Sequence, residues 1–252
     1  MDTPTHAFSY LSPSMPVSMG DWWFDVANPE HFWVQRRFNV MTRMADGLIR
    51  SCRRAGEIGC GNGLLQKAIE HHYGKPLTGF DLNELALQKN VSQTSPLFCY
   101  DIHQRDAEFR EQFDLLILFD VLEHITEELE FLSSVRFHLA PSGILLVNVP
   151  AHQLLYSDYD RAAGHVRRYS IKQLTDVSEK AGFRVRAISY LGLPLLPLLV
   201  IRKAMKLNRE NGRAGFDSRG PVLNFALSIL ARCELLPQQL VGTSIMAVLE
   251  KT

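Results

Sequence analysis

Residues 57–63, EIGCGNG, combine a carboxylate with three glycines at alternate positions. Glycine at this density costs chain entropy, so it indicates unusual dihedral angles or a ligand that presses on the backbone. A dinucleotide-binding turn has the spacing G-x-G-x-x-G, a P-loop ends in G-K-[ST], and this stretch has neither pattern. Glu57 stands before the glycines, where it would repel a phosphate and suit a cation. The stretch therefore favours a cationic ligand over a pyrophosphate.

Further acidic residues stand at the ends of later apolar runs. Asp81 follows the glycines by about twenty residues and ends the run TGFD. Asp101 ends the run CYD, and Asp120 ends FDLLILFD. Ligands of parallel sheets bind outside the carboxyl ends of the strands, so we expect these carboxylates to share one site with Glu57.

Apolar runs alternate with helical patterns from residue 54 onward. This alternation predicts right-handed crossovers and a mostly parallel, doubly wound sheet. The expected strands are 54–60, 76–82, 96–102, 113–120, 144–150, 184–191 and 243–252. The helices between them include one that begins after Thr126 as N-cap and one that opens on a capping box of Ser170 and Gln173.

The chain divides into three expected parts. Residues 1–50 form a loose N-terminal arm (1–20) and a cap helix, residues 51–191 with 243–252 form the core, and residues 192–242 form a helical insertion that acts as an acceptor-site lid. The cap helix carries apolar residues at helical spacing, namely Val34, Phe38, Met41, Ala45 and Leu48. Its arginines fall on other faces: Arg36, Arg37 and Arg43.

Taken together, these motifs resemble the class I S-adenosylmethionine-dependent methyltransferases, most closely their small-molecule branch. Glu57 and the glycines match the first motif of that family, and Asp81 and Asp101 match its ribose and adenine positions. FDLLILFDVLEH matches the fourth strand and its loop. LAPSGILLVNVP resembles the pattern L-x-P-G-G-x-L-x-x-x-x-P, with Ser142 in place of the first glycine of the pair. The resemblance covers residues 30–190 and the terminal strand.

The resemblance implies an α/β, Rossmann-like fold: a doubly wound seven-stranded sheet, mostly parallel with an antiparallel last strand, and a helical cap or insertion. It implies S-adenosyl-L-methionine as the cofactor and transfer of its methyl group to a small molecule, with a hydroxyl acceptor preferred. Carbon or nitrogen methylation, and a non-catalytic cofactor-binding subunit, are the alternatives. The residues expected to bind the cofactor are Glu57, Gly59, Cys60, Gly61, Gly63, Asp81, Leu82, Asp101, Ile102, Phe119 and Asp120.

Two histidines compete for the role of general base toward the acceptor. His124 follows the fourth strand in DVLEH, and His165 lies in DRAAGHVRRYS before a capped helix. An imidazole with a pKa near neutrality can take a proton from a hydroxyl, whereas packing beside the cofactor is the other explanation for His124. The residues expected to contact the acceptor are Trp33, Arg167, Arg168 and Tyr169, with the arginines as a clamp for a carboxylate or phosphate or simply as exposed helix-entry residues.

The resemblance also raises the possibility of a metal, because some quinone O-methyltransferases of this type hold a divalent cation on an E-x-x-E-H stretch. Here Asp120 stands at the first position of that pattern, ahead of Glu123 and His124. We expect no metal.

Composition narrows the function further. The chain has 27 basic and 27 acidic residues, and a zero net charge without an aromatic-rich basic patch argues against nucleic acid as partner. Nucleic-acid methyltransferases that act on exocyclic amines usually carry an Asn/Asp-Pro-Pro-aromatic motif after the fourth strand, and this chain lacks it there. The glycine spacing disfavours a nicotinamide dehydrogenase. The cysteines form no CxxC pair and indicate neither a zinc site nor a disulfide framework.

The location expected for the chain is cytoplasmic. The start of the sequence lacks a signal-peptide pattern, and no apolar run reaches the ~18 residues of a membrane span. Residues 191–213 combine the apolar run LGLPLLPLLVI with several basic residues. This segment could contact a membrane surface peripherally, enclose a hydrophobic acceptor or pack on the core as a lid. The oligomeric state is left open.

Overall fold

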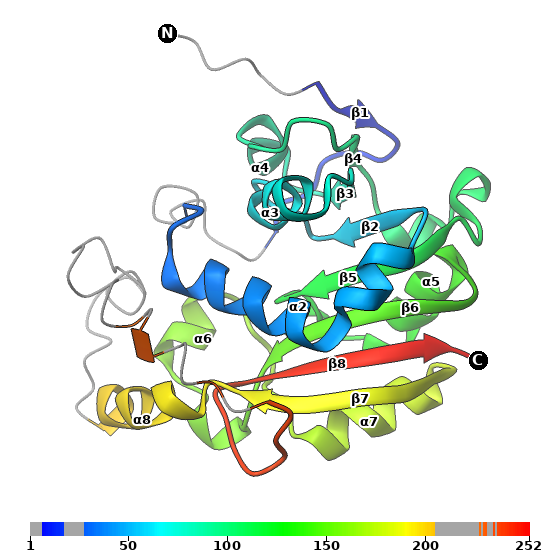
Figure 1. Cartoon of the computed structure of the whole chain (residues 1–252). Coiled ribbons are helices and arrows are strands. Elements are labelled where there is room, and N and C mark those ends of the chain that lie inside the picture. The colour runs from blue at the N-terminus through cyan, green and yellow to red at the C-terminus, as the bar shows by residue number, and fades with distance from the viewer. Residues whose placement is uncertain (1–6, 18–27, 205–226, 228, 231–233, 235) are drawn as a thin grey trace, which may run out of the picture.

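A single sheet with helices on both faces forms the molecule in the computed structural model (Figure 1). The structure describes residues 7–17, 28–204, 227, 229–230, 234 and 236–252. The strands are β1 Ser9–Tyr10, β2 Ala55–Ile58, β3 Thr78–Asp81, β4 Leu97–Cys99, β5 Phe113–Phe119, β6 Leu139–Pro150, β7 Phe183–Leu191 and β8 Ser244–Lys251.

The strand order is β1-β4-β3-β2-β5-β6-β8-β7. All neighbours from β1 to β6 pair in parallel, and β8 pairs antiparallel with both β6 and β7. The chain order reverses between β2 and β5, so the crevice of a doubly wound sheet lies at the carboxyl ends of these two strands. The predicted doubly wound sheet and its antiparallel last strand are confirmed.

One strand was missed. The sheet has eight strands rather than seven, because Ser9–Tyr10 pairs with β4 in a segment that we predicted to be a loose arm. A two-residue strand leaves too little periodicity to be seen in a sequence. The rest of the predicted arm, residues 1–6 and 18–20, lies outside the described residues.

Helices cover both faces of the sheet. They are α2 Phe32–Ser51, α3 Leu64–Tyr73, α4 Glu84–Gln88, α5 Glu128–His138, α6 Asp158–Ala162, α7 Ile171–Lys180 and α8 Leu196–Ala204. Short 3₁₀ turns link them: η1 Ile102–Gln104, η2 Ala107–Phe109, η3 Leu122–His124, η4 Gln153–Leu155 and η5 Leu193–Leu195.

Two apolar layers hold these helices to the sheet. On one face, Met41 and Ala45 of α2 and Ile69 of α3 pack with Leu115 and Ile117 of β5. On the other face, Phe131 and Leu132 of α5 and Leu174 of α7 pack in one cluster with residues of β5 and β6 that point the opposite way. These strand residues include Leu116 and Leu145. Alternate residues of β5 therefore serve different layers, as expected for a strand buried on both faces.

Capping signals in the sequence predicted the first residues of two helices, α7 and α5. The α7 capping box of Ser170 and Gln173 is confirmed. The prediction of Thr126 as the N-cap of α5 was wrong, because the helix begins one residue later with Glu127 at that position and no side-chain cap.

The prediction that Arg36 lies away from the apolar face of the cap helix was also wrong. Its side chain is buried, and Nε donates to Oε2 of Glu234 at 3.1 Å. The backbone amide of Gly192 donates to the same carboxylate, at 2.8 and 2.9 Å from its two oxygens. An arginine can enter a core when a buried carboxylate pairs with it, and that partner lies far away in the sequence.

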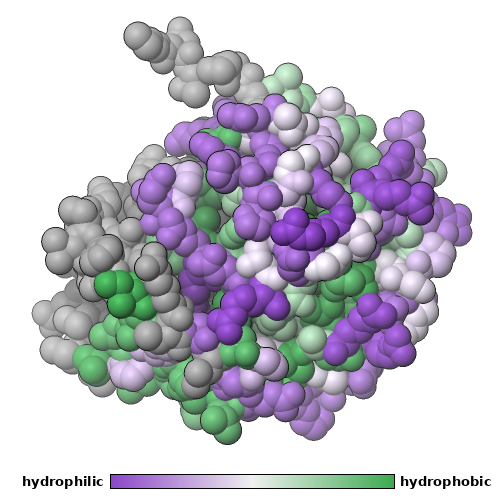
Figure 2. Space-filling view, viewed as in Figure 1, coloured by the Kyte–Doolittle hydropathy of each residue, from purple (hydrophilic) through white to green (hydrophobic). Residues whose placement is uncertain are grey.

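The predicted insertion is described only in part. Helix α8 carries exposed Leu198, Val200 and Ile201, and Figure 2 shows hydrophobic surface in the region where Figure 1 labels α8. Residues 205–213 of the expected membrane contact, and most of the second apolar helix expected at 221–236, lie outside the described residues. Among the helices that the structure describes, none combines the length and apolar character that a membrane span requires.

Candidate functional site

A cavity of about 470 Å³ opens at the carboxyl ends of β2, β3, β4 and β5. This volume falls in the range of roughly 300–1,000 Å³ typical of small-molecule sites. The cavity wall contains all but one of the predicted cofactor residues: Glu57, Gly59, Cys60, Gly61, Asp81, Leu82, Asp101, Ile102, Phe119 and Asp120. The exception is Gly63, which sits at the N-cap of α3 with a φ of 77°.

The glycine loop needs its glycines for backbone shape and for space. Gly59 has a φ of 73°, and a Cβ there would lie 2.4 Å from Cγ2 of Val121. Gly61 has a φ of 54° and turns its amide toward Asp81, whose Oδ2 accepts at 2.7 Å. The loop thus exposes main chain to the cavity in a conformation that other residues rarely adopt.

Two carboxylates at the ends of β3 and β4 face the cavity. The other oxygen of Asp81, Oδ1, accepts from the Asn83 amide at 2.8 Å, and burial raises the pKa of Asp81 while these amide bonds oppose the rise. Asp101 accepts from the amide of His103 at 2.9 Å. Each carboxylate oxygen has further lone pairs that can accept a hydroxyl or an amine.

The other end of the cavity is lined by Glu57, Arg37 and Asp120. Glu57 is buried, burial raises its pKa well above the usual range, and its Oε2 has no hydrogen-bond partner within the described part of the chain. Arg37 contacts Oδ2 of Asp120, and Nδ2 of Asn148 donates to Oδ1 of Asp120 at 2.6 Å. Asp120 has a φ of 54°, a strained conformation that residues at functional sites often adopt.

Arg37 is the residue that the sequence reasoning missed. We predicted that it would lie away from the apolar face of the cap helix, and the structure places it in the cavity wall. Its position three residues after buried Val34 and four before buried Met41 carried that signal, since residues at these spacings share a helix face.

S-adenosylmethionine fits this set of groups. Asp81 can accept ribose hydroxyls, and Ile102 and Phe131 add apolar surface to the cavity wall on which a flat ring could pack. The Glu57 oxygen that has no partner in the described part of the chain can accept from an amine, and a cationic amine there would oppose the rise in pKa that burial causes. Arg37, which also contacts Asp120, suits a carboxylate. The cavity therefore offers groups that suit the ribose, the amine and the carboxylate of that cofactor.

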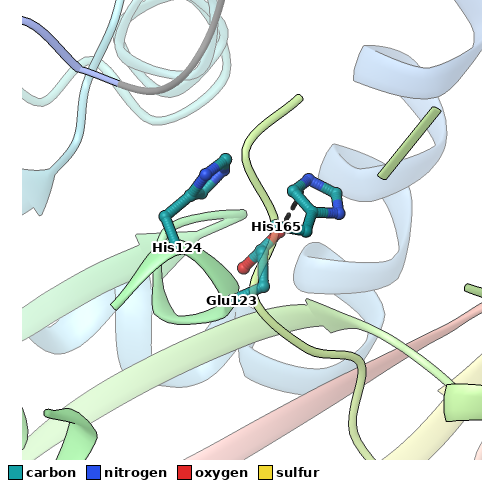
Figure 3. A group of neighbouring side chains, drawn as sticks. All are labelled: Glu123, His124 and His165. Carbon is teal, nitrogen blue, oxygen red and sulfur yellow. Dashed lines mark ion pairs between the residues drawn. The ribbon is translucent and has the colours of Figure 1, made fainter. Parts of the chain in front are cut away.

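The two candidate bases, His124 and His165, lie close to each other and to Glu123 (Figure 3). His124 lines the cavity, and the His165 ring meets it edge to face with ring centroids 4.8 Å apart. Burial, and then the neighbouring His165, lowers the pKa of His124 to about 4, so His124 is neutral at physiological pH. His165 is not part of the cavity wall itself.

Asp160 fixes the orientation of His165. Its Oδ1 accepts from Nδ1 of His165 at 2.9 Å, which leaves Nε2 directed toward Glu123 at 3.9 Å from Oε1. Arg168 donates to both oxygens of Asp160, from Nε at 2.7 Å and Nη2 at 2.9 Å. Burial opposes ionisation of Asp160, but the hydrogen bonds from His165 and Arg168 outweigh it and hold the pKa of Asp160 well below its usual range.

The residues predicted to contact the acceptor have partners within the protein. Arg168 is buried against Asp160, Arg167 pairs with Oε2 of Glu128 at 2.6 Å, and the hydroxyl of Tyr169 donates to the same oxygen at 2.7 Å. Trp33 packs on Arg36, whose Cζ lies 4.9 Å from the ring centroid. None of these four residues belongs to the cavity wall, and the two guanidinium groups and the tyrosine hydroxyl are already paired within the protein.

Three groups could serve as metal ligands. Glu123, His124 and His165 each offer one ligand atom, and these atoms lie within 4.8 Å of one another (Figure 3). Asp120, the first residue of the E-x-x-E-H-like stretch, is turned instead toward Arg37 and Asn148. The expectation that no metal binds stays a prediction.

The fold and the cavity together define a class I S-adenosylmethionine-dependent methyltransferase. A family model described as a methyltransferase domain matches residues 48–188, which is more than half of the chain. The chain belongs to this family.

Relatives and solved structures agree with the assignment. The chain is similar to a ubiquinone biosynthesis O-methyltransferase of Haemophilus ducreyi, with 26% identity over 139 residues that cover 50% of this chain and 58% of the relative. It is also similar to a malonyl-[acyl-carrier protein] O-methyltransferase of the same organism, with 35% identity over 107 residues covering 39% and 41% of the two chains. The match thus spans little more than half of the ubiquinone relative.

The fold is shared with a SAM-dependent methyltransferase from Archaeoglobus fulgidus. The TM-score is 0.57 at 17% identity, with 86% of this chain and 94% of that chain covered. At this identity the likeness concerns the fold alone.

Proposed function

We propose that this chain transfers the methyl group of S-adenosylmethionine to a hydroxyl oxygen of a small-molecule acceptor. The observation that carries the proposal is His165, oriented by a buried Asp160 carboxylate and packed against His124 at the cavity wall. Transfer to oxygen requires removal of a hydroxyl proton, and an imidazole held by a carboxylate is a common general base. The names of the two curated relatives, both O-methyltransferases, support the same preference.

The roles of the residues follow from their contacts. When bound, the cofactor supplies an electrophilic methyl group on a sulfonium. Asp160 holds Nδ1 of His165 in its protonated form, so Nε2 carries the lone pair that takes the hydroxyl proton. Arg168 fixes Asp160, and neutral His124 forms part of the wall beside the reacting groups. Alignment of the acceptor oxygen with the methyl carbon, about 3 Å away, contributes several kcal/mol of the rate enhancement.

The chemical nature of the acceptor is suggested by α8. Its exposed Leu198, Val200 and Ile201 favour an acceptor with an apolar part, which the insertion at 192–242 would enclose as a lid. A cytoplasmic location and the absence of a nucleic-acid partner belong to the same proposal. A peripheral membrane contact through 191–213 is the alternative use of this apolar segment.

An extract screen tests the proposal. The chain is incubated with metabolite extract and S-adenosylmethionine carrying a ¹³C-labelled methyl group, and the labelled product is isolated. Its ¹³C chemical shift distinguishes O-methyl from N-methyl and C-methyl groups. We expect an O-methyl product, and we expect His165→Ala to lower turnover by about 10²-fold with cofactor affinity kept.

The matched control is His71→Ala, which changes an exposed histidine on α3 and leaves turnover unchanged. A labelled N-methyl or C-methyl product would replace the proposal by its alternative. A chain that binds the cofactor and labels no metabolite would favour the non-catalytic subunit.

A further inference from the structure

The N-terminal segment of residues 7–17 is anchored beside the cofactor cavity. Its strand β1 pairs in parallel with β4, and the amides of Leu11 and Ser12 both donate to the carbonyl of Cys99, at 2.9 and 3.0 Å. Phe8 packs against a small apolar cluster that contains Cys60 and Cys99. The segment therefore extends the sheet at the edge where the adenosyl part of the cofactor is expected.

Beyond β1 the segment reaches two of the cofactor loops. The amide of Asp101 donates to Oγ of Ser12 at 2.8 Å, and the amide of Met15 donates to the carbonyl of Leu82 at 3.0 Å. Asp101 and Leu82 both belong to the cavity wall, and so does Val17. One stretch of chain thus crosses the ends of β3 and β4 and closes part of the cavity.

The segment is bound on one side only. Ser12 is buried, whereas Leu11 is 37% exposed, Met15 52% and Val17 38%. A stretch held to the sheet by a few backbone hydrogen bonds, with most of its side chains in solvent, is stabilised weakly on its own. The attachment of residues 11–17 to the rest of the protein therefore depends on the positions of the two loops that carry Leu82 and Asp101.

We infer that residues 7–17 form a strap that completes the adenosine end of the cofactor site and is stabilised by the cofactor. A bound adenosine fixes the loops that carry Leu82 and Asp101, and this favours the hydrogen bonds from Met15 and to Ser12. By reciprocity, the closed strap raises the affinity for every ligand that carries the adenosine, including the product S-adenosylhomocysteine. The strap therefore slows release of both cofactor and product.

Ser12→Ala in the full chain is the variant that tests the strap. It removes the acceptor of the Asp101 amide and leaves the groups that line the cavity in place. We expect S-adenosylhomocysteine to bind about fivefold more weakly, mainly through faster dissociation, because the variant removes the hydrogen bond to the Asp101 amide that the bound ligand favours. Calorimetry gives the affinity, and stopped-flow displacement gives the dissociation rate.

The matched control is Ser14→Ala, since Ser14 is exposed in the same segment and its substitution should leave both quantities unchanged. Hydrogen exchange of the wild-type chain provides a second readout that needs no variant. The amides of Leu11, Ser12 and Met15 should exchange more slowly when S-adenosylhomocysteine is present. Wild-type affinity in Ser12→Ala would overturn the inference, and so would exchange rates at these amides that the ligand leaves unchanged.

Discussion

Two parts of the site use charge in different ways: the cofactor end, at the ends of β3 and β4, and the histidine end, around His165. At the cofactor end, Asp81 and Asp101 are held by backbone amides of neighbouring turns and keep lone pairs directed to the cavity. At the histidine end, the charged side chains satisfy one another, as Asp160 does with Arg168 and His165. The first arrangement is built to receive polar groups of a ligand, and the second is built to hold one imidazole in a fixed orientation.

The difference has a consequence for stability. Backbone amides that hold a carboxylate at a loop contribute modestly, because water can replace them when the loop opens. A buried carboxylate paired with a buried guanidinium cannot lose one partner without leaving a charge in the interior. The histidine end should therefore be the more sensitive of the two to substitution, and the cofactor end the more tolerant.

The largest effect is expected at Asp160. Asp160→Ala removes a fully buried carboxylate and leaves Arg168, 6% exposed, without its anion. Breaking a buried pair in this way costs about 3–5 kcal/mol of the free energy of unfolding. Urea denaturation followed by circular dichroism measures the loss.

Asp158 provides the control within the same helix, α6. Its side chain is 69% exposed and pairs with exposed Arg161. Such a surface pair contributes at most about 1 kcal/mol, so Asp158→Ala should stay close to wild type. Equal losses in the two variants would show that the buried network is not what stabilises this region.

A smaller effect is expected from the pH dependence at His124. Its pKa in the folded chain is about 4, below the ordinary value, so the unfolded chain binds more protons between these two pKa values. Stability from this group is fully present above about pH 6.5 and is lost as pH falls toward 4. Between pH 7 and 4.5 we expect the wild-type chain to lose about 2 kcal/mol more than His124→Gln.

The measurement is urea unfolding of both chains at the two pH values, with His71→Gln as the exposed-histidine control. The control should follow the wild-type pH dependence. If His124→Gln also follows it, then the neutral state of His124 in the fold would be contradicted, together with its assigned place in the cavity wall.

The grouping of the predicted cofactor residues around one cavity could be predicted from the sequence because its signals are local. Glu57, the glycines, Asp81 and Asp101 each stand at the end of an apolar run, and parallel strands must bring such ends together. The strand and helix alternation gave the same sheet, apart from the two residues of β1. Spacing along the chain was sufficient there.

The histidine end and the arginines could not be predicted in the same way. Arg36 pairs with a residue 198 positions away, and Arg37 with one 83 positions away. A helical pattern shows which residues share a face, but it does not show whether a carboxylate from another part of the chain packs against that face. Arg168 was predicted to bind an anionic group of the acceptor, whereas its guanidinium donates to Asp160. A single sequence does not show whether an arginine pairs with an anion of a ligand or with a carboxylate of the protein.

A calorimetric titration tests the division between the two ends most directly. S-adenosylhomocysteine is titrated into the wild-type chain, Asp81→Ala and His165→Ala. We predict that Asp81→Ala binds about ten- to a hundredfold more weakly through the lost hydrogen bonds, and that His165→Ala binds like the wild type. Binding of NADH in place of S-adenosylhomocysteine, or His165→Ala binding as weakly as Asp81→Ala, would show that the carboxylates at the ends of β3 and β4 do not form a separate cofactor site.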